Sequence, residues 1–71
     1  MEYEHLAQAE RHVREGVAHV QRQRHLAVEL ERKGHDASTA WRLLNQFEEL
    51  LALHIQGRDR IMAELKKIEA A

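Results

Sequence analysis

One stretch decides how this chain folds: Gly34-His35-Asp36-Ala37-Ser38-Thr39. It holds the only Ser and the only Thr of the sequence, which has no Pro. Gly can adopt the left-handed backbone conformation that closes a helix. Asp36 is a good N-cap for a following helix, with Ser38 or Thr39 as alternatives. The stretch therefore predicts the end of one helix, a short turn and the start of a second helix.

Both flanks of this stretch are rich in Ala, Leu, Glu, Arg and Gln, which favour helix. We expect a first helix over residues 2–33, a turn at 34–36 and a second helix over 37–68. Each helix would have about 32 residues and a length of roughly 48 Å. Because short connections make neighbouring helices antiparallel, the predicted fold is all-α, a single two-helix antiparallel hairpin.

The composition excludes several classes of protein. Among 71 residues, 11 Lys and Arg are balanced by 12 Asp and Glu, and the two signs are interspersed. This pattern gives little support for nucleic-acid binding. The absence of Cys rules out a disulfide scaffold. No apolar run approaches the roughly 20 residues of a membrane span, and the acidic N-terminal residues lack an apolar signal core, so we expect a cytoplasmic protein.

The apolar surface of the second helix is broader than a single partner helix can cover. Its stripe consists of Leu43, Leu44, Phe47, Leu50, Leu51, Ile61, Met62, Leu65 and Ile68. The matching strip on the first helix is dominated by Ala and Val and is thin. We therefore expect self-association, most simply a homodimer in which two hairpins form a four-helix bundle. The predicted self-association face consists of Leu44, Phe47, Leu51, His54, Ile61 and Leu65. Another helical protein is the alternative partner, and a marginal monomer is the alternative state.

Four polar residues fall within the apolar arcs of the two helices: Glu10, Arg24, His54 and Arg58. Folding the hairpin brings Arg24 level with Glu48 and Glu49, and Glu10 within a turn of Arg58. A charge in such a position must be paired or must reach water. We interpret Arg24 with Glu48 or Glu49, and Glu10 with Arg58, as pairs that fix the register of the helices. A ligand or partner site around His54 and Arg58 is the alternative.

Two glycines, Gly16 and Gly57, interrupt otherwise helical sequence. Each costs about 1 kcal/mol relative to Ala. In the expected hairpin they lie nearly opposite each other, which would let the two backbones approach closely. Two glycines that are merely tolerated are an equally good interpretation.

Six histidines are many for a chain of this length. His5, His12 and His19 recur every seven residues and so share one flank of the first helix. They cannot share one metal ion, because seven residues rise roughly 10 Å along a helix. A metal site would need the second helix or a second chain, and His19 with His54 is the best candidate pair. The simpler interpretation is a half-exposed flank without metal or cofactor.

The sequence gives no sign of catalysis. Its hydroxyl side chains are Tyr3 and the turn residues Ser38 and Thr39. A phosphate-binding Gly-rich loop and a His-Glu-x-x-His motif are both missing. We therefore predict a non-enzymatic structural or interaction module, with His-mediated binding of a metal or small ligand as the alternative.

Several short segments, taken in their order along the chain, carry a family resemblance. They are Arg11-His12-Val13, Glu15-Gly16, Gln23-Arg24, Glu29-Leu30-Glu31-Arg32, Gly34-His35-Asp36, Leu43-Leu44, Phe47-Glu48, Leu53-His54 and Arg58-Asp59-Arg60. Together they resemble a group of short uncharacterised alphaproteobacterial proteins over nearly the whole chain. The resemblance implies a bacterial cytosolic helical hairpin, and it implies no functional residue.

Overall fold

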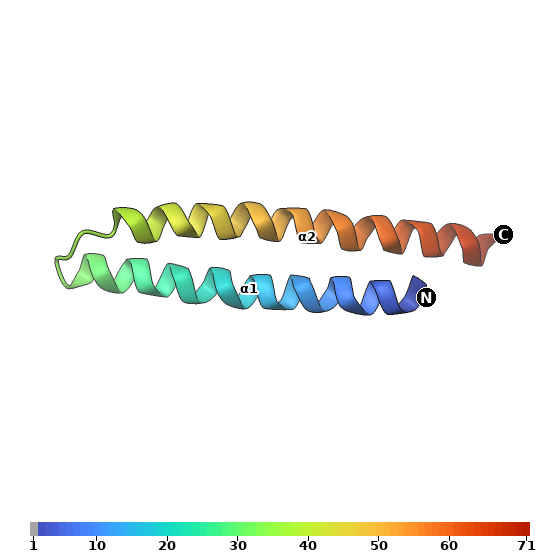
Figure 1. The fold of residues 1–71 in the computed structure, drawn as a ribbon, viewed down its shortest axis with the longest axis horizontal. Coiled ribbons are helices and arrows are strands. Elements are labelled where there is room, and N and C mark those ends of the chain that lie inside the picture. Colours follow the sequence, from blue (N-terminus) through green and yellow to red (C-terminus); the bar gives the residue numbers. More distant parts are fainter. Residues whose placement is uncertain (1) are drawn as a thin grey trace.

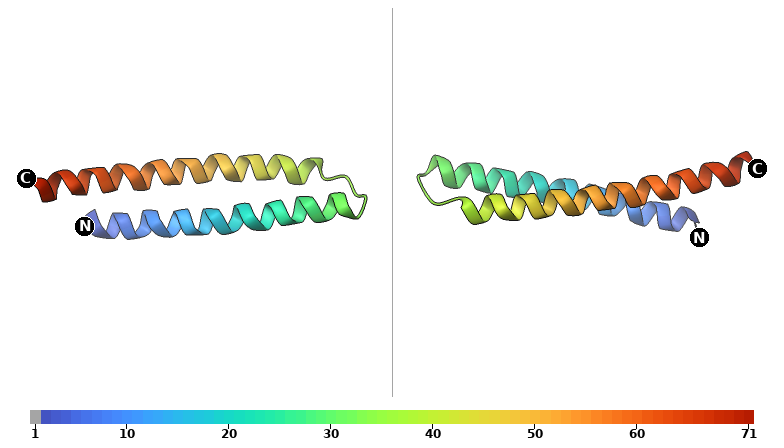
Figure 2. Two further views of the ribbon diagram at one scale, coloured as in Figure 1. Left: turned by 180° about the vertical axis from the view of Figure 1, so that it is seen from behind. Right: turned by 90° about the horizontal axis from the view of Figure 1, so that it is seen from above.

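The computed structural model describes residues 2–71 and consists of two long helices. Helix α1 spans Glu2–Arg32 and helix α2 spans Ser38–Ala70. They lie side by side in antiparallel directions, as Figures 1 and 2 show, and form a rod of 58 × 14 × 14 Å. No strand occurs within the described residues. The predicted all-α hairpin is thus confirmed.

Helix α1 ends at the predicted glycine. Gly34 has a φ of 77°, the left-handed conformation that glycine adopts without a steric penalty. The Gly34 N–H donates to the Glu31 carbonyl at 3.0 Å, and the His35 N–H donates to the Leu30 carbonyl at 2.9 Å. This pair of bonds is a Schellman motif, which satisfies the last carbonyls of the helix.

Helix α2 begins differently from the expectation. The N-cap residue is Ala37, not Asp36, and its own side chain cannot cap. Asp36 still contributes, because its Oδ1 accepts hydrogen bonds from the Ser38 backbone N–H at 3.0 Å and from the Ser38 hydroxyl at 2.7 Å. These bonds lower the pKa of Asp36 below its ordinary value of 3.8, the backbone bond most strongly.

The two helices are offset along the rod. The connection covers residues 33–37, so α1 ends one residue before the expected 33, and α2 runs from 38 to 70 rather than from 37 to 68. In Figure 1, α1 extends beyond the start of α2 at the turn, and α2 extends beyond α1 at the open end. The structure therefore pairs residues differently from a hairpin folded symmetrically about residue 36.

The glycines illustrate the offset. A Cβ at Gly16 would stand 3.0 Å from Leu51 Cδ1, whereas nothing lies within 4 Å of a Cβ at Gly57. The expectation that the two glycines face each other is wrong. Gly16 alone accommodates a side chain of the opposite helix.

The core of the hairpin is small. Six residues of the described part are buried: Val20, Ala27, Ala37, Ala40, Leu44 and Leu65. Half of them are alanines, which let the helices approach closely near the turn. There the Gln23 Nε2 donates a hydrogen bond to the Ala40 carbonyl at 3.0 Å and ties α1 to the first turn of α2. Within residues 2–71, neither helix is sufficiently long and apolar to cross a membrane.

Candidate functional site

A groove of about 280 Å³ opens along one side of the hairpin, between the middle parts of α1 and α2. From α2 come Phe47, Leu50, Leu51 and His54. The residues from α1 are His12, Glu15, Gly16 and His19. The lining therefore combines an apolar surface with three imidazoles and one carboxylate.

The seven-residue spacing explains why these side chains meet. Seven residues are nearly two helical turns, so His12 and His19 share one side of α1, and Phe47 and His54 share one side of α2. Gly16 lies between His12 and His19 on α1 and gives room to the Leu51 side chain of α2. We call this flank the groove edge. Five of its residues line the groove, and the seven-residue spacing adds three more; together they are His5, His12, His19 and Leu26 on α1 and Leu43, Phe47, Leu50 and His54 on α2.

The imidazole of His54 packs against that of His12, with ring centroids 5.1 Å apart and ring planes tilted by 49°. His19 lies instead beside Phe47, at a centroid distance of 6.0 Å. The expected pairing of His19 with His54 is therefore wrong by one seven-residue repeat. The offset of the helices is the cause. It shifts α1 along α2 by about one seven-residue repeat, which is roughly 10 Å.

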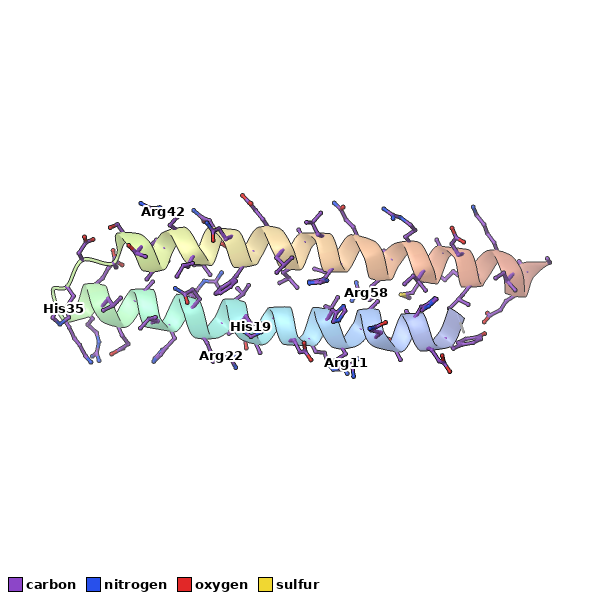
Figure 3. The ribbon with its side chains drawn as sticks, in the orientation of Figure 1. Arg11, His19, Arg22, His35, Arg42 and Arg58 are labelled. Carbon is purple, nitrogen blue, oxygen red and sulfur yellow. The ribbon has the colours of Figure 1, made fainter. Side chains whose placement is uncertain are left out.

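The other histidines differ from this pair in their surroundings. His19 is exposed, and its Nδ1 lies 2.8 Å from the Arg22 Nη2 in a hydrogen bond. Figure 3 labels both residues on α1. His5 is exposed near the N-terminal end of α1, whereas His12 and His54 are half-buried. His12 and His54 are thus the two imidazoles that the fold brings together inside the groove.

The predicted self-association face divides into two groups. Leu44 and Leu65 are 4% and 7% exposed, so they already pack against α1 within one chain. The other four predicted residues are half-buried: Phe47, Leu51, His54 and Ile61. The broad stripe of α2 thus serves both the hairpin core and the open groove.

The predicted self-association face omitted three exposed leucines at the groove or beside it, although Leu43 and Leu50 belonged to the broader predicted stripe. Leu26, Leu43 and Leu50 are 49%, 39% and 50% exposed. A signal for Leu26 was available, because it follows His19 by seven residues and continues the series of His5 and His12 along α1. Leu43 and Leu50 are separated by the same interval on α2.

The polar residues of the helix interface behave in two ways. Arg24 and Glu48 form an ion pair across the hairpin, with Nη2 to Oε2 at 3.2 Å. Arg58 bonds its neighbour Asp59 instead of Glu10, through Nε at 3.1 Å and Nη2 at 3.0 Å. In Figure 3, Arg58 lies between the two ribbons, whereas Arg42 projects from the outer side of α2. The structure does not bring Glu10 and Arg58 into an ion pair.

A second contact is expected on the same side as the Arg24–Glu48 ion pair, because Tyr3 precedes Arg24, and Glu69 follows Glu48, by three intervals of seven residues. The Tyr3 hydroxyl donates to the Glu69 Oε1 at 2.7 Å, and this carboxylate raises the pKa of Tyr3 above 10.0. Arg24 follows His19 by five residues, which places the two side chains about 140° apart around α1. We call this opposite flank, with Tyr3, Arg24, Glu48 and Glu69, the polar edge.

The described residues contain no group of three or more His, Cys, Asp or Glu side chains placed to hold a metal ion. Of the three imidazoles that line the groove, those of His12 and His54 are in ring contact. The absence of catalytic activity stays a prediction, and so does the interaction role.

Comparisons with known protein families, with curated proteins and with solved structures gave no match to this chain. The resemblance to alphaproteobacterial proteins therefore stays a prediction as well.

Proposed function

We propose that this chain is a non-enzymatic structural or protein-interaction module of the cytoplasm that self-associates through its groove edge. Its partner is a second copy of the same chain. Two hairpins that meet along their groove edges form a four-helix bundle, the arrangement in which antiparallel helix pairs bury their remaining apolar surface.

The observation that carries this proposal is the excess of accessible surface. The hairpin exposes 5572 Å². A compact monomer of 8.3 kDa exposes about 4,600 Å² according to the scaling of surface with mass. The excess is about 1,000 Å², and a stable dimer of ordinary size buries about 800 Å² on each partner. Docking of one second copy would thus bring the exposed surface of each chain close to that of a compact monomer of the same mass.

The shape of the chain leads to the same conclusion. The radius of gyration is 16.5 Å, against about 11 Å for a compact domain of this length. The six buried residues include three alanines, and no large side chain in the described part is completely buried. A core of this size contributes little burial of apolar surface, so cover from a second copy would add substantially to stability.

The groove edge is the flank that suits a second copy. It carries three exposed leucines beside a groove lined by Phe47 and Leu51. The polar edge carries the Arg24–Glu48 ion pair and the Tyr3–Glu69 hydrogen bond. Exposed polar groups of this kind remain solvated and need no cover from a second copy. Apolar centres with polar surroundings are typical of protein interfaces.

Sedimentation equilibrium over a range of chain concentrations tests the proposal. The wild type is expected at about twice its chain mass. Leu43→Lys places a charge on the groove edge and is expected to weaken association at least about tenfold. Met62→Lys is the matched control, because both side chains are 39% exposed and Met62 follows Glu48 on the polar edge by two intervals of seven.

The control should retain the wild-type mass. A folded wild-type chain that stays at the mass of a single chain at high concentration would overturn the proposal. Equal weakening by Leu43→Lys and Met62→Lys would overturn the assignment to the groove edge. A complex with a different helical protein that excludes the second copy would replace the homodimer as the functional state.

A further inference from the structure

We propose that the self-associated form binds one Zn²⁺ between its two copies, with His12 and His54 of each copy as the four ligands. This inference rests on the proposed self-association through the groove edge. It gives the His12–His54 pair a chemical role, whereas self-association alone does not explain why two imidazoles lie together in the groove.

The first support is the geometry of the pair. The centroids of the two rings are 5.1 Å apart, and the planes are tilted by 49° rather than stacked. Two imidazole nitrogens that bind one tetrahedral Zn²⁺ at about 2 Å place their ring centroids about 5 Å apart. The spacing within one chain is therefore already that of two ligands of a common ion.

The second support is the number of ligands. Closed zinc sites have four ligands, and one chain provides two at this position. Two copies related by a two-fold axis provide four. His54 is the central residue of α2, which has 33 residues from Ser38 to Ala70. A two-fold axis across the middle of the rod therefore brings both pairs together while the hairpins overlap along their full length.

The surroundings favour this pair over the other histidines. The Nδ1 of His19 already interacts with Arg22, whose positive charge opposes a cation nearby. His12 and His54 are half-buried in the groove, where an ion is partly shielded from water. Glu15 lines the same groove, and a carboxylate in this position can accept the second N–H of a metal-bound imidazole.

The test uses the full chain, freed of metal with a chelator and studied at about pH 7.5, where imidazoles are mostly neutral. Zn²⁺ is titrated while sedimentation reports the mass and calorimetry reports the stoichiometry. We expect one Zn²⁺ for every two chains. At free Zn²⁺ ten times the dissociation constant of the site, dimerisation should tighten roughly tenfold. Chelator should reverse the effect.

His12→Asn and His54→Asn are each expected to abolish the response to Zn²⁺, with circular dichroism confirming that the helices remain. His19→Asn is the matched control, since it removes an imidazole from the same groove, and it should respond like the wild type. Equal loss in His19→Asn would overturn the ligand assignment, and one Zn²⁺ bound per chain would overturn the shared site.

The outcomes also separate this inference from the proposed function. A wild type that dimerises but shows no response to Zn²⁺ overturns the zinc site and leaves self-association intact. A folded wild type that stays single both with and without Zn²⁺ overturns both proposals.

Discussion

Gly16 of α1 and Leu51 of α2 meet directly across the hairpin. A Cβ at Gly16 would stand 3.0 Å from the Leu51 Cδ1 and 3.8 Å from the Leu51 Cα. The glycine thus provides the space that the leucine side chain occupies. Both residues line the groove, so this contact shapes its central part.

This contact predicts different outcomes for alanine at the two helical glycines. Gly57→Ala should raise the free energy of unfolding by about 1 kcal/mol, because Ala favours helix and the space at Gly57 is open. Gly16→Ala should gain less, since Leu51 must move by a few tenths of an ångström. Urea unfolding at one fixed chain concentration measures both. A larger gain for Gly16→Ala than for Gly57→Ala would contradict the packing described here.

Gly34 provides the opposite case. Its φ of 77° is unfavourable for a residue with a Cβ. Gly34→Ala should therefore lower the free energy of unfolding by about 1–2 kcal/mol. The same chemical change at Gly57 has the opposite sign, which makes it the control. Unfolding in urea measures the change in the free energy of unfolding for both variants. A Gly34→Ala chain as stable as the wild type would show that the turn has another conformation.

The turn could be predicted from the sequence because no other glycine lies near Gly34 to end the first helix at a different position. The pairing of the helices was not readable in the same way. His12 precedes Val13 and His19 precedes Val20, so a shift of α1 by seven residues exchanges equivalent residues at these positions. The structure has the alignment that brings His12 rather than His19 to His54. The Gly16–Leu51 contact and the hydrogen bond from Gln23 to the Ala40 carbonyl belong to this alignment.

The edge that carries the groove was partly readable. Phe47, Leu51 and His54 were expected on the associating face and do line the groove. Leu44 was expected with them but is buried against α1. Sequence periodicity identifies a broad stripe, and the angle at which the helices pack decides which part of it stays open.

The bonds between Asp36 and Ser38 predict a dependence on acid. Because folding lowers the pKa of Asp36, its stabilising contribution is present above its ordinary value of 3.8 and is lost as the pH falls through the lowered pKa. Asp36→Ala should therefore lower the melting temperature by a few degrees at neutral pH and by less in strong acid.

Asp36→Asn is the control for this effect. Its side-chain oxygen can still accept both hydrogen bonds but does not titrate. Asp36→Asn should keep most of the wild-type stability at neutral pH. The difference in melting temperature between Asp36→Asn and Asp36→Ala should not change with pH. If Asp36→Ala lowers the melting temperature relative to the wild type by the same amount at neutral and strongly acidic pH, the ionised carboxylate makes no contribution.

The Arg24–Glu48 ion pair should contribute little to stability. The two side chains are 50% and 45% exposed, so water and salt screen the attraction. A double-mutant cycle with Arg24→Ala and Glu48→Ala is expected to give a coupling free energy of about 0.2–1 kcal/mol, and less at high salt. A coupling that does not change with salt would mean that the pair is shielded from water.

Tyr3 gives a direct test of how the open end of the rod is held. It is the only tyrosine, so the near-ultraviolet absorbance of tyrosinate reports it alone. The Glu69 carboxylate raises its pKa above 10.0, and the stabilising contribution of this bond is present below the ordinary pKa and is lost as the pH rises through the raised one. Glu69→Gln should move the titration midpoint back towards 10.0, whereas Glu64→Gln on the same helix should leave it raised. Equal midpoints in the wild type and Glu69→Gln would show that α1 and α2 do not meet at this end.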